Sequence, residues 1–239
     1  MEDNWQERTL LQLGTEGVEL LRESTVAIIG LGGVGAVAAE MVCRAGVGSI
    51  IIADSDTYNI TNKNRQIGAL DSTIGKKKTE VMSRRLQDIN KDLKIRVIEE
   101  YIAEENLERL LNFKIDFLID AIDTLSPKIA LIKFCVEHKI PLVSSMGAGA
   151  KYDATKVRIT DLKKSFNCPL AYMLRKRLRK EGISSGFNVV FSEELPDKGA
   201  IVPFEEKNKK SRTGTISYLP AVFGCVCAQA AICHLIKKC

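Results

Sequence analysis

Short runs of β-branched and aliphatic residues alternate along this chain with longer segments whose apolar positions recur at helical spacing. This alternation is typical of repeated strand-helix-strand winding, and it predicts an α/β fold with a doubly wound, mostly parallel sheet. The apolar runs predict strands at residues 25–29, 49–53, 94–98, 115–119, 141–144, 156–159 and 188–191, and the spaced segments predict helices at residues 33–45, 76–90, 103–111, 126–139 and 168–180.

The sequence contains no feature that would divide it into separate domains. Its 239 residues are 45% apolar, with no low-complexity tract and no internal repeat, so we expect a single domain over residues 1–239. Within that domain we expect a helical arm at 1–24, a core at 25–160, a crossover segment at 161–213 and a terminal strand and helix at 214–239. The charged stretch at 205–212 is expected to belong to a long, partly ordered crossover loop.

One apolar segment, residues 216–236, is long enough to cross a membrane. It is interrupted by Pro220, Gln229 and His234, and these polar or helix-breaking groups would be costly in lipid. Its many small residues suit a helix that packs closely against a sheet. We therefore expect a buried terminal helix and no stable membrane insertion, with a membrane anchor as the alternative.

The cysteines indicate the compartment of the protein. There are seven, an odd number, and no N-terminal signal peptide precedes them, which predicts free thiols in the reducing cytoplasm. No two of them are spaced as the C-x2-C pair of a tetrathiolate zinc site, so no structural zinc is expected.

A glycine-rich turn joins the first predicted strand to the first predicted helix, with glycines at Gly30, Gly32, Gly33 and Gly35. Glycines at such a turn let the backbone approach a phosphate, and the helix N-terminus supplies free N–H groups. Asp54 follows Gly35 by 19 residues, at the end of the second strand, where a carboxylate binds ribose hydroxyls. The two features together predict a nucleotide site, whereas the turn alone could also be a tight turn without a ligand.

A polar block after the second strand suits a triphosphate better than a dinucleotide, because several cations and amides follow the ribose-binding acid. Its members are Asp56, Asn64, Arg65, Gln66 and Lys78. Asp123, just after a buried strand, would lie at the same edge of the sheet and could hold Mg²⁺ on the phosphates. Taken singly, Lys78 could begin a solvated helix and Asp123 could cap one.

In this order the glycines, Asp54, Asp56, Asn64, Arg65, Gln66, Lys78 and Asp123 resemble the ATP site of the ThiF, MoeB and ubiquitin-activating E1 enzymes, over about residues 8–145. The resemblance implies a Rossmann-like adenylation domain in which Arg65 and Lys78 stabilise the triphosphate and Asp123 supports the metal-bound pyrophosphate. It also implies a homodimer in which Arg8 reaches the partner's site. The acceptor carboxylate is already ionised, so adenylation calls for positioning and charge stabilisation more than for a base.

The second half of the chain, in residues 144–153, 168–170 and 189–193, is similar to the tRNA threonylcarbamoyladenosine dehydratases. This resemblance implies that ATP activates the threonyl carboxylate of N6-threonylcarbamoyladenosine at position 37 of tRNA, and that cyclisation displaces AMP. A basic segment with Arg175, Arg177, Arg179 and Lys180 could contact tRNA phosphates, although a solvated helix is often as basic. Cys168 stands where that family commonly has Asp, so we assign it no catalytic role.

Three other functions stay open at this point. A MoeB-like enzyme would adenylate the C-terminus of a ubiquitin-like sulfur carrier, although such enzymes usually hold a zinc site that this chain lacks. Tyr152 and Lys156 have the spacing of a short-chain dehydrogenase pair, provided that they lie on a helix. A nucleotide-gated binding module without catalysis is the third. The sequence also leaves open a monovalent cation beside the site and a sulfur-transfer partner such as a cysteine desulfurase system.

Overall fold

A seven-stranded sheet forms the centre of the protein in the computed structural model, which describes residues 4–206 and 209–238. The strand order is β3-β2-β1-β4-β5-β7-β6, with only β6 antiparallel to its neighbour. The strands are β1 Thr25–Ile29, β2 Ser49–Ala53, β3 Lys94–Ile98, β4 Phe117–Asp120, β5 Leu142–Ser145, β6 Val157–Asp161 and β7 Asn188–Ser192. The expected doubly wound, mostly parallel α/β fold is confirmed.

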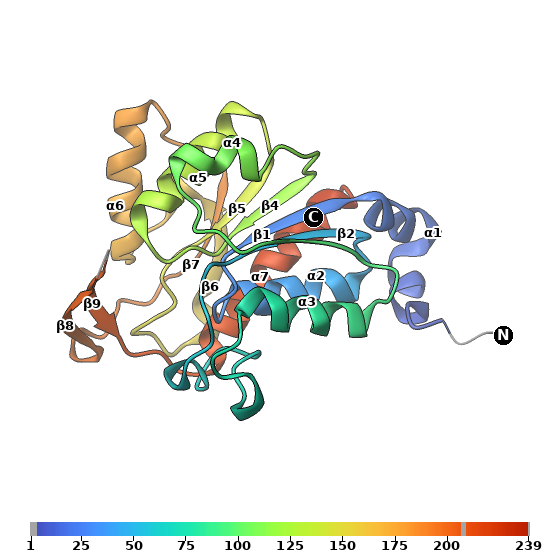
Figure 1. Cartoon of the computed structure of the whole chain (residues 1–239). Helices are drawn as coiled ribbons and strands as arrows, with labels where there is room; N and C mark the ends of the chain where they lie inside the picture. Colours follow the sequence, from blue (N-terminus) through green and yellow to red (C-terminus); the bar gives the residue numbers. More distant parts are fainter. Residues whose placement is uncertain (1–3, 207–208, 239) are drawn as a thin grey trace.

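Helices cover both faces of the sheet (Figure 1). One face is covered by α2 Gly35–Ala45, α3 Lys78–Ile89 and α7 Tyr218–Leu235, and the other by α4 Leu107–Leu110, α5 Leu125–Glu137 and α6 Pro169–Leu178. Short 3₁₀ turns join these elements: η1 Ile60–Asn62, η2 Asp71–Thr73, η3 Glu104–Asn106, η4 Ala154–Lys156, η5 Leu162–Lys164, η6 Arg179–Glu181 and η7 Lys198–Ala200. Because both faces are covered, the central strands read as continuous apolar runs and not as alternating ones.

The strand order reverses between β1 and β4, which are direct neighbours although β2 and β3 lie between them in the sequence. At such a switch point the loops after the two strands diverge to opposite faces and leave a crevice at the carboxyl edge of the sheet. The loop after β1 is the glycine-rich turn, and the loop after β4 leads to Asp123. The fold therefore brings together two segments that lie about 90 residues apart.

The N-terminal arm is a kinked helix, α1 Glu7–Glu23, whose backbone leaves helical geometry at Gly14 (φ 73°, ψ 173°). Its last turn lies at the amino edge of the sheet, where the Gly48 N–H donates to the Leu21 carbonyl at 3.1 Å. The chain before the kink exposes large apolar side chains, with Leu11 on α1 80% exposed and Trp5, just before the helix, 50% exposed. The first three residues of the expected arm lie outside the described residues.

Part of the expected crossover loop is a β-hairpin, which corrects the sequence-based prediction. β8 Ile201–Glu206 and β9 Lys209–Thr213 pair with each other in an antiparallel two-stranded sheet apart from the main one (Figure 1). Most of the hairpin's positions are charged or polar, so the alternation that marks a half-buried strand is missing. The helix expected at 103–111 is also shorter, because a 3₁₀ turn precedes α4.

The terminal apolar segment forms α7, which is long and apolar enough to span a membrane by composition alone, with a mean hydropathy of 1.6. It packs instead against α2 and against strands β4 to β7, as expected for a core helix. Gly224 makes this close approach feasible, because a Cβ there would lie 2.5 Å from the Val34 carbonyl oxygen. Only 39% of the helix is buried, however, so a partly exposed apolar side faces away from the sheet.

Candidate nucleotide-binding site

The glycine-rich turn lies between β1 and α2, and its glycines serve two different needs. Gly30 has a positive φ of 95°, and a Cβ there would lie 2.9 Å from the Ala121 carbonyl oxygen. A Cβ on Gly35 would overlap the Gly30 carbonyl oxygen, so these two glycines are required by the backbone itself. Around Gly32 the nearest heavy atom outside the turn is Gln66 Nε2, at 4.0 Å from such a Cβ. The turn is therefore open on the side where a phosphate could approach.

Asp54, directly after β2, is tied to this turn through its carboxylate. Leu31 N–H donates to Oδ2 at 2.6 Å and Asp56 N–H donates to Oδ1 at 2.8 Å. Burial raises the pKa of Asp54, although the nearby Lys78 ammonium and these two N–H groups act in the opposite direction. The carboxylate that we expected beside the ribose is thus fixed against the glycine turn.

Lys78 begins α3 with a buried side chain that reaches back to the same acids. Its Nζ donates to Asp56 Oδ2 at 2.8 Å and lies 3.8 Å from Asp54 Oδ2. Asp56 is largely exposed while Lys78 is not, so the positive charge is held in place by the protein and partly neutralised at the surface. A bound polyphosphate could compete with Asp56 for this ammonium.

Arg65 and Gln66 lie against the glycine turn from the opposite side. The Arg65 carbonyl oxygen and Cγ would lie 3.1 and 3.4 Å from a Cβ on Gly33. Gln66 is buried, and its Oε1 has no hydrogen-bond partner among the described residues. A buried acceptor without a donor is costly, and a nucleoside, which carries hydroxyl and amino donors, could satisfy it. The residues present therefore fit a bound nucleotide.

Asn64 connects this site to the segment that leads into α7. Its Nδ2 donates to the Thr215 carbonyl at 2.9 Å, while its Oδ1 accepts a hydrogen bond from Arg65 Nη1 at 2.9 Å. The same short segment is bound on its other side, where Ala150 N–H donates to the Gly214 carbonyl at 2.8 Å and the Tyr218 hydroxyl donates to the Tyr152 carbonyl at 2.7 Å. Residues 214–218 thus form a strap between the nucleotide side and the loop after β5.

Asp123 lies on the loop between β4 and α5 with an exposed side chain. No group of three or more His, Cys, Asp or Glu side chains able to hold a metal occurs among the described residues. Mg²⁺ is commonly held by one or two carboxylates together with substrate phosphates. Asp123 fits that kind of metal binding, and a site built from protein ligands alone is not found in the described part of the chain.

Of the residues expected to contact tRNA, one is bound within the protein and the others are exposed. Arg175 is half-buried and donates through Nη1 to the Ser165 carbonyl at 2.8 Å, so it fixes α6 to the preceding turn. Arg177, Arg179 and Lys180 are exposed on α6 and η6, as is Arg8 on α1.

The dehydrogenase-like pair does not lie on a helix, which removes the geometry on which the redox alternative depended. Tyr152 lies in irregular backbone, and Lys156 ends the 3₁₀ turn η4 beside Asp153, at 3.5 Å.

Sequence reasoning missed two buried lysines. Lys128 pairs with Asp120 within the core, and Lys151 donates to the Ser192 carbonyl at 3.0 Å, with a pKa lowered by burial. Lys128 shares a helix face with Leu131 and Cys135, which are both fully buried. This helical spacing could have indicated from the sequence that Lys128 is buried. Lys151 lies in a glycine-containing loop without periodicity, so no comparable signal existed for it.

The fold and this site define a doubly wound α/β protein with a nucleotide crevice at its switch point. Residues 6–238 match the ThiF family, and the chain belongs to that family. It is 40% identical over 238 residues to the tRNA threonylcarbamoyladenosine dehydratase of Bacillus subtilis, covering 96% of this chain and 94% of the relative.

The solved structures give the same result. The Escherichia coli tRNA N6-threonylcarbamoyladenosine dehydratase in complex with ATP is 33% identical to this chain, with a TM-score of 0.90 over 99% of this chain and 96% of the other. Similarity to the molybdopterin-synthase adenylyltransferase of Escherichia coli is 30% over 153 residues, 64% of this chain. The dehydratases are thus similar over almost the whole chain, and the adenylyltransferase over part of it.

Proposed function

We propose that this protein is an ATP-dependent tRNA threonylcarbamoyladenosine dehydratase. It adenylates the threonyl carboxylate of N6-threonylcarbamoyladenosine at position 37 of tRNA with release of pyrophosphate, and ring closure within the modification then displaces AMP, with the net loss of one water. The observation that carries the proposal is the Lys78 ammonium held 2.8 Å from Asp56 beside the glycine turn. An ammonium group at that position could bind the oxygens of a triphosphate.

The site residues would act mainly through charge and position. Arg65 and Lys78 stabilise the negative charge that develops when the carboxylate attacks the α-phosphate, and Asp54 holds the ribose. Asp123 would help to hold Mg²⁺ on the phosphates, and the ion would supply positive charge for the pyrophosphate. Hydroxide is a poor leaving group and AMP a good one, which is why ATP is needed for this dehydration.

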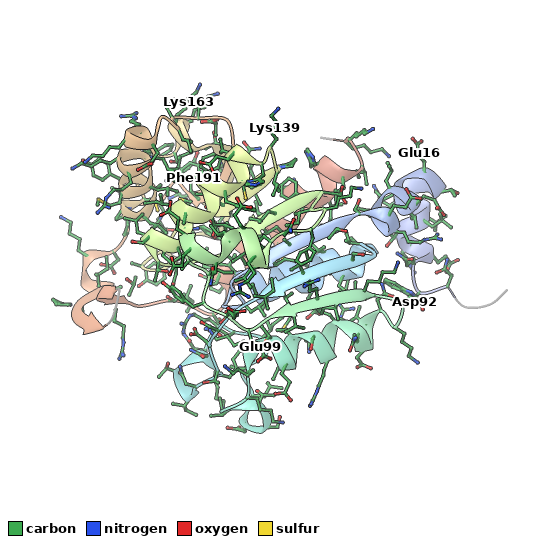
Figure 2. All side chains as sticks on the ribbon, turned by 45° about the horizontal axis from the view of Figure 1, so that its top comes forward. Glu16, Asp92, Glu99, Lys139, Lys163 and Phe191 are labelled. Carbon is green, nitrogen blue, oxygen red and sulfur yellow. The ribbon has the colours of Figure 1, made fainter. Side chains whose placement is uncertain are left out.

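α6, with the turns η5 before it and η6 after it, forms the surface that we assign to tRNA. α6 contains no acidic residue, and Glu181 in the following turn η6 pairs with Lys133 on α5. The exposed cations of this surface are Lys163, Lys164, Lys176, Arg177, Arg179 and Lys180. Lys163 projects at the outer edge of the molecule (Figure 2). These cations would contact phosphates and give binding that weakens with salt, whereas Arg175 holds the helix in place.

A homodimer accounts for two apolar surfaces that a single copy leaves exposed. One is the first half of α1 with Leu11, and the other is the outer side of α7, where Tyr218 is exposed and Val222 is partly buried. Arg8 lies in the first turn of α1 near Gln6, which lies against Gly46 just before β2 begins, while the glycine turn follows the carboxyl end of β1. This separation supports a role for Arg8 in the partner's site.

A sulfur-carrier acceptor is the second candidate, and it is supported only by similarity over part of the chain. A monovalent cation beside the nucleotide, a sulfur-transfer partner and a cytoplasmic location stay predictions from the sequence.

The test is to incubate the protein with ATP, Mg²⁺ and threonylcarbamoylated tRNA, and to weigh the nucleosides after digestion. Loss of one water from the modified nucleoside, with one AMP released for each, is the expected result. Arg65→Ala should lose roughly 3–4 kcal/mol of transition-state stabilisation. Arg84→Ala, which removes an exposed arginine paired with Glu80 on α3, is the matched control and should react like the wild type. AMP release only with a carrier-protein C-terminus would contradict the proposal.

A further inference from the structure

A fully buried ion pair joins the ends of two neighbouring strands beneath the nucleotide site. Asp120 ends β4 and Lys128 lies on α5; both are 0% exposed, and Lys128 Nζ lies 2.6 Å from Asp120 Oδ2. The same ammonium donates to Ser144 Oγ at 3.0 Å and to the Ser145 carbonyl at 3.1 Å, both in β5. The Ser144 hydroxyl in turn donates to Asp120 Oδ2 at 2.6 Å. All three N–H groups of the ammonium are therefore used.

Stability alone gives little reason for this pair. Removing two charges from water costs several kcal/mol per ion, and buried pairs can often be replaced by uncharged residues of similar size at no loss of stability. A network in which every donor is satisfied does, however, fix the groups that it joins with high precision. The role of the pair therefore depends on the loops that follow the ends of β4 and β5.

On the β4 side, the network fixes the loop that bears Asp123. Asp120 Oδ1 accepts the N–H of Ile122 at 3.1 Å, which sets the first turn of that loop. The Ala121 carbonyl in the same turn lies beside Gly30, in the space that a side chain there would need. Asp120 thus supports both the nucleotide turn and the path to Asp123.

On the β5 side, Lys128 fixes the strand end from which residues 146–151 depart. This loop continues into Tyr152, which is bound to the strap at residues 214–218. It is also the part of the chain with dehydratase-like sequence, so we place it toward the acceptor. The ammonium of one buried lysine therefore contacts both the strand that leads to the nucleotide side and the strand that leads to the acceptor side.

We propose that Asp120 and Lys128 are positioning residues, which hold the Asp123 loop and the loop after β5 in one fixed relation so that the α-phosphate and the acceptor carboxylate meet. The proposal rests on the proposed function for the identity of the acceptor. Neither residue is placed in contact with ATP or with the carboxylate. Their effect on rate comes from geometry, where a displacement of about 1 Å can cost a hundredfold.

The test compares Lys128→Met with the double variant Asp120→Asn/Lys128→Met. The single variant leaves Asp120 buried without its cation, so it should melt at a lower temperature than the wild type. The double variant contains no buried charge at this place and should regain most of the melting temperature. In both, kcat for AMP release with threonylcarbamoylated tRNA should fall roughly ten- to hundredfold, while the Kd for ATP stays within about threefold of the wild type.

Lys133→Met is the matched control, since Lys133 lies on the same helix but forms its ion pairs at the surface, and it should keep the wild-type kcat. Ser144→Ala, which removes only one hydrogen-bond partner of Lys128, gives the same comparison of kcat with Kd if Lys128→Met does not fold.

Recovery of kcat together with the melting temperature in the double variant would mean that the pair serves stability alone, and this would overturn the proposal. So would a loss explained entirely by weaker ATP binding. If the wild type released AMP only with a carrier protein, the proposed function would fail, and the same comparison would be made with that acceptor.

Discussion

Gly32 and Gly35 lie three positions apart in one turn, yet the structure predicts different effects for the same substitution. A methyl group on Gly35 would overlap the Gly30 carbonyl oxygen, so Gly35→Ala should destabilise the fold by about 1–3 kcal/mol, as overpacking does. A methyl group on Gly32 meets no atom closer than 4.0 Å, so Gly32→Ala should melt like the wild type. It should nevertheless weaken ATP binding, because the methyl group points into the space left for phosphate.

Thermal melting and ATP titration of the two variants check this prediction. If Gly32→Ala bound ATP as tightly as the wild type, the open side of the turn would not be the phosphate site.

The raised pKa of Asp54 predicts the pH dependence of ATP binding. Burial is the main cause of the increase, and an ionised carboxylate accepts stronger hydrogen bonds than a protonated carboxyl group does. As the pH falls through this raised pKa, Asp54 is protonated and its proposed bond to the ribose is weakened, at a higher pH than for an ordinary aspartate. The ratio of the ATP Kd of Asp54→Asn to that of the wild type should therefore shrink on acidification, and taking the ratio cancels the titration of the phosphates. A ratio that does not change with pH would exclude Asp54 as the ribose ligand.

At the scale of residues, the sequence predicted which side chains lie together where they belong to neighbouring strand ends. The glycines, Asp54 and Lys78 belong to ordered segments around two strand ends, and the structure brings them together as expected. The Asp120–Lys128 pair could not be found in this way, because an acid ending a buried strand and a lysine on an apolar helix face become partners only through the tertiary fold. The Arg175 bond to Ser165 was missed for the same reason.

At the scale of elements, the buried parallel strands were predicted to within about two residues, because burial on both faces requires continuous apolar runs. The hairpin of β8 and β9 was not predicted, since its few apolar residues do not alternate and its pairing partner is a neighbouring segment and not the main sheet. Surface hairpins of this kind depend on turn geometry and cross-strand pairs, which a charged sequence does not reveal.

The division of the α6 cations leads to a prediction about tRNA binding. Lys176→Ala and Arg179→Ala should each reduce the slope of log Kd against log salt by about one, because each removes one phosphate contact. Arg175→Ala should lower the melting temperature instead, because it releases α6 from Ser165. Binding of threonylcarbamoylated tRNA at several salt concentrations measures the first effect, with Arg22→Ala on α1, an exposed arginine paired with Glu19, as the control. Equal slopes for all these variants would place the tRNA elsewhere.

At the scale of the whole molecule, the position of α1 predicts that each active site needs two chains. Arg8→Ala and Arg65→Ala should each be inactive alone. In a mixed dimer, one chain carries Arg8→Ala and the other carries Arg65→Ala. One of the two sites then receives an intact Arg65 from its own chain and an intact Arg8 from the partner. Mixing the two variants under conditions that allow exchange should therefore restore about a quarter of the wild-type activity, because half of the dimers are mixed and each has one good site.

AMP release from the mixture, compared with each variant alone, measures this complementation. A mixture as inactive as its components, although mass measurement with one variant isotopically labelled shows that the chains have exchanged, would mean that Arg8 does not act on the partner's site.

The strap at residues 214–218 has a consequence for the timing of events in solution. Because Asn64 holds the Thr215 carbonyl and also accepts from Arg65, a nucleotide that orders Arg65 should also slow the opening of the strap. Amide deuterium exchange reports such openings. With ATP alone, exchange should slow at Ala150, whose N–H is bonded to Gly214, although that amide belongs to a loop on a different strand. The enzyme would then bind ATP first and present a closed, ordered surface to the tRNA only afterwards. Attack on the α-phosphate would therefore wait until the tRNA is bound.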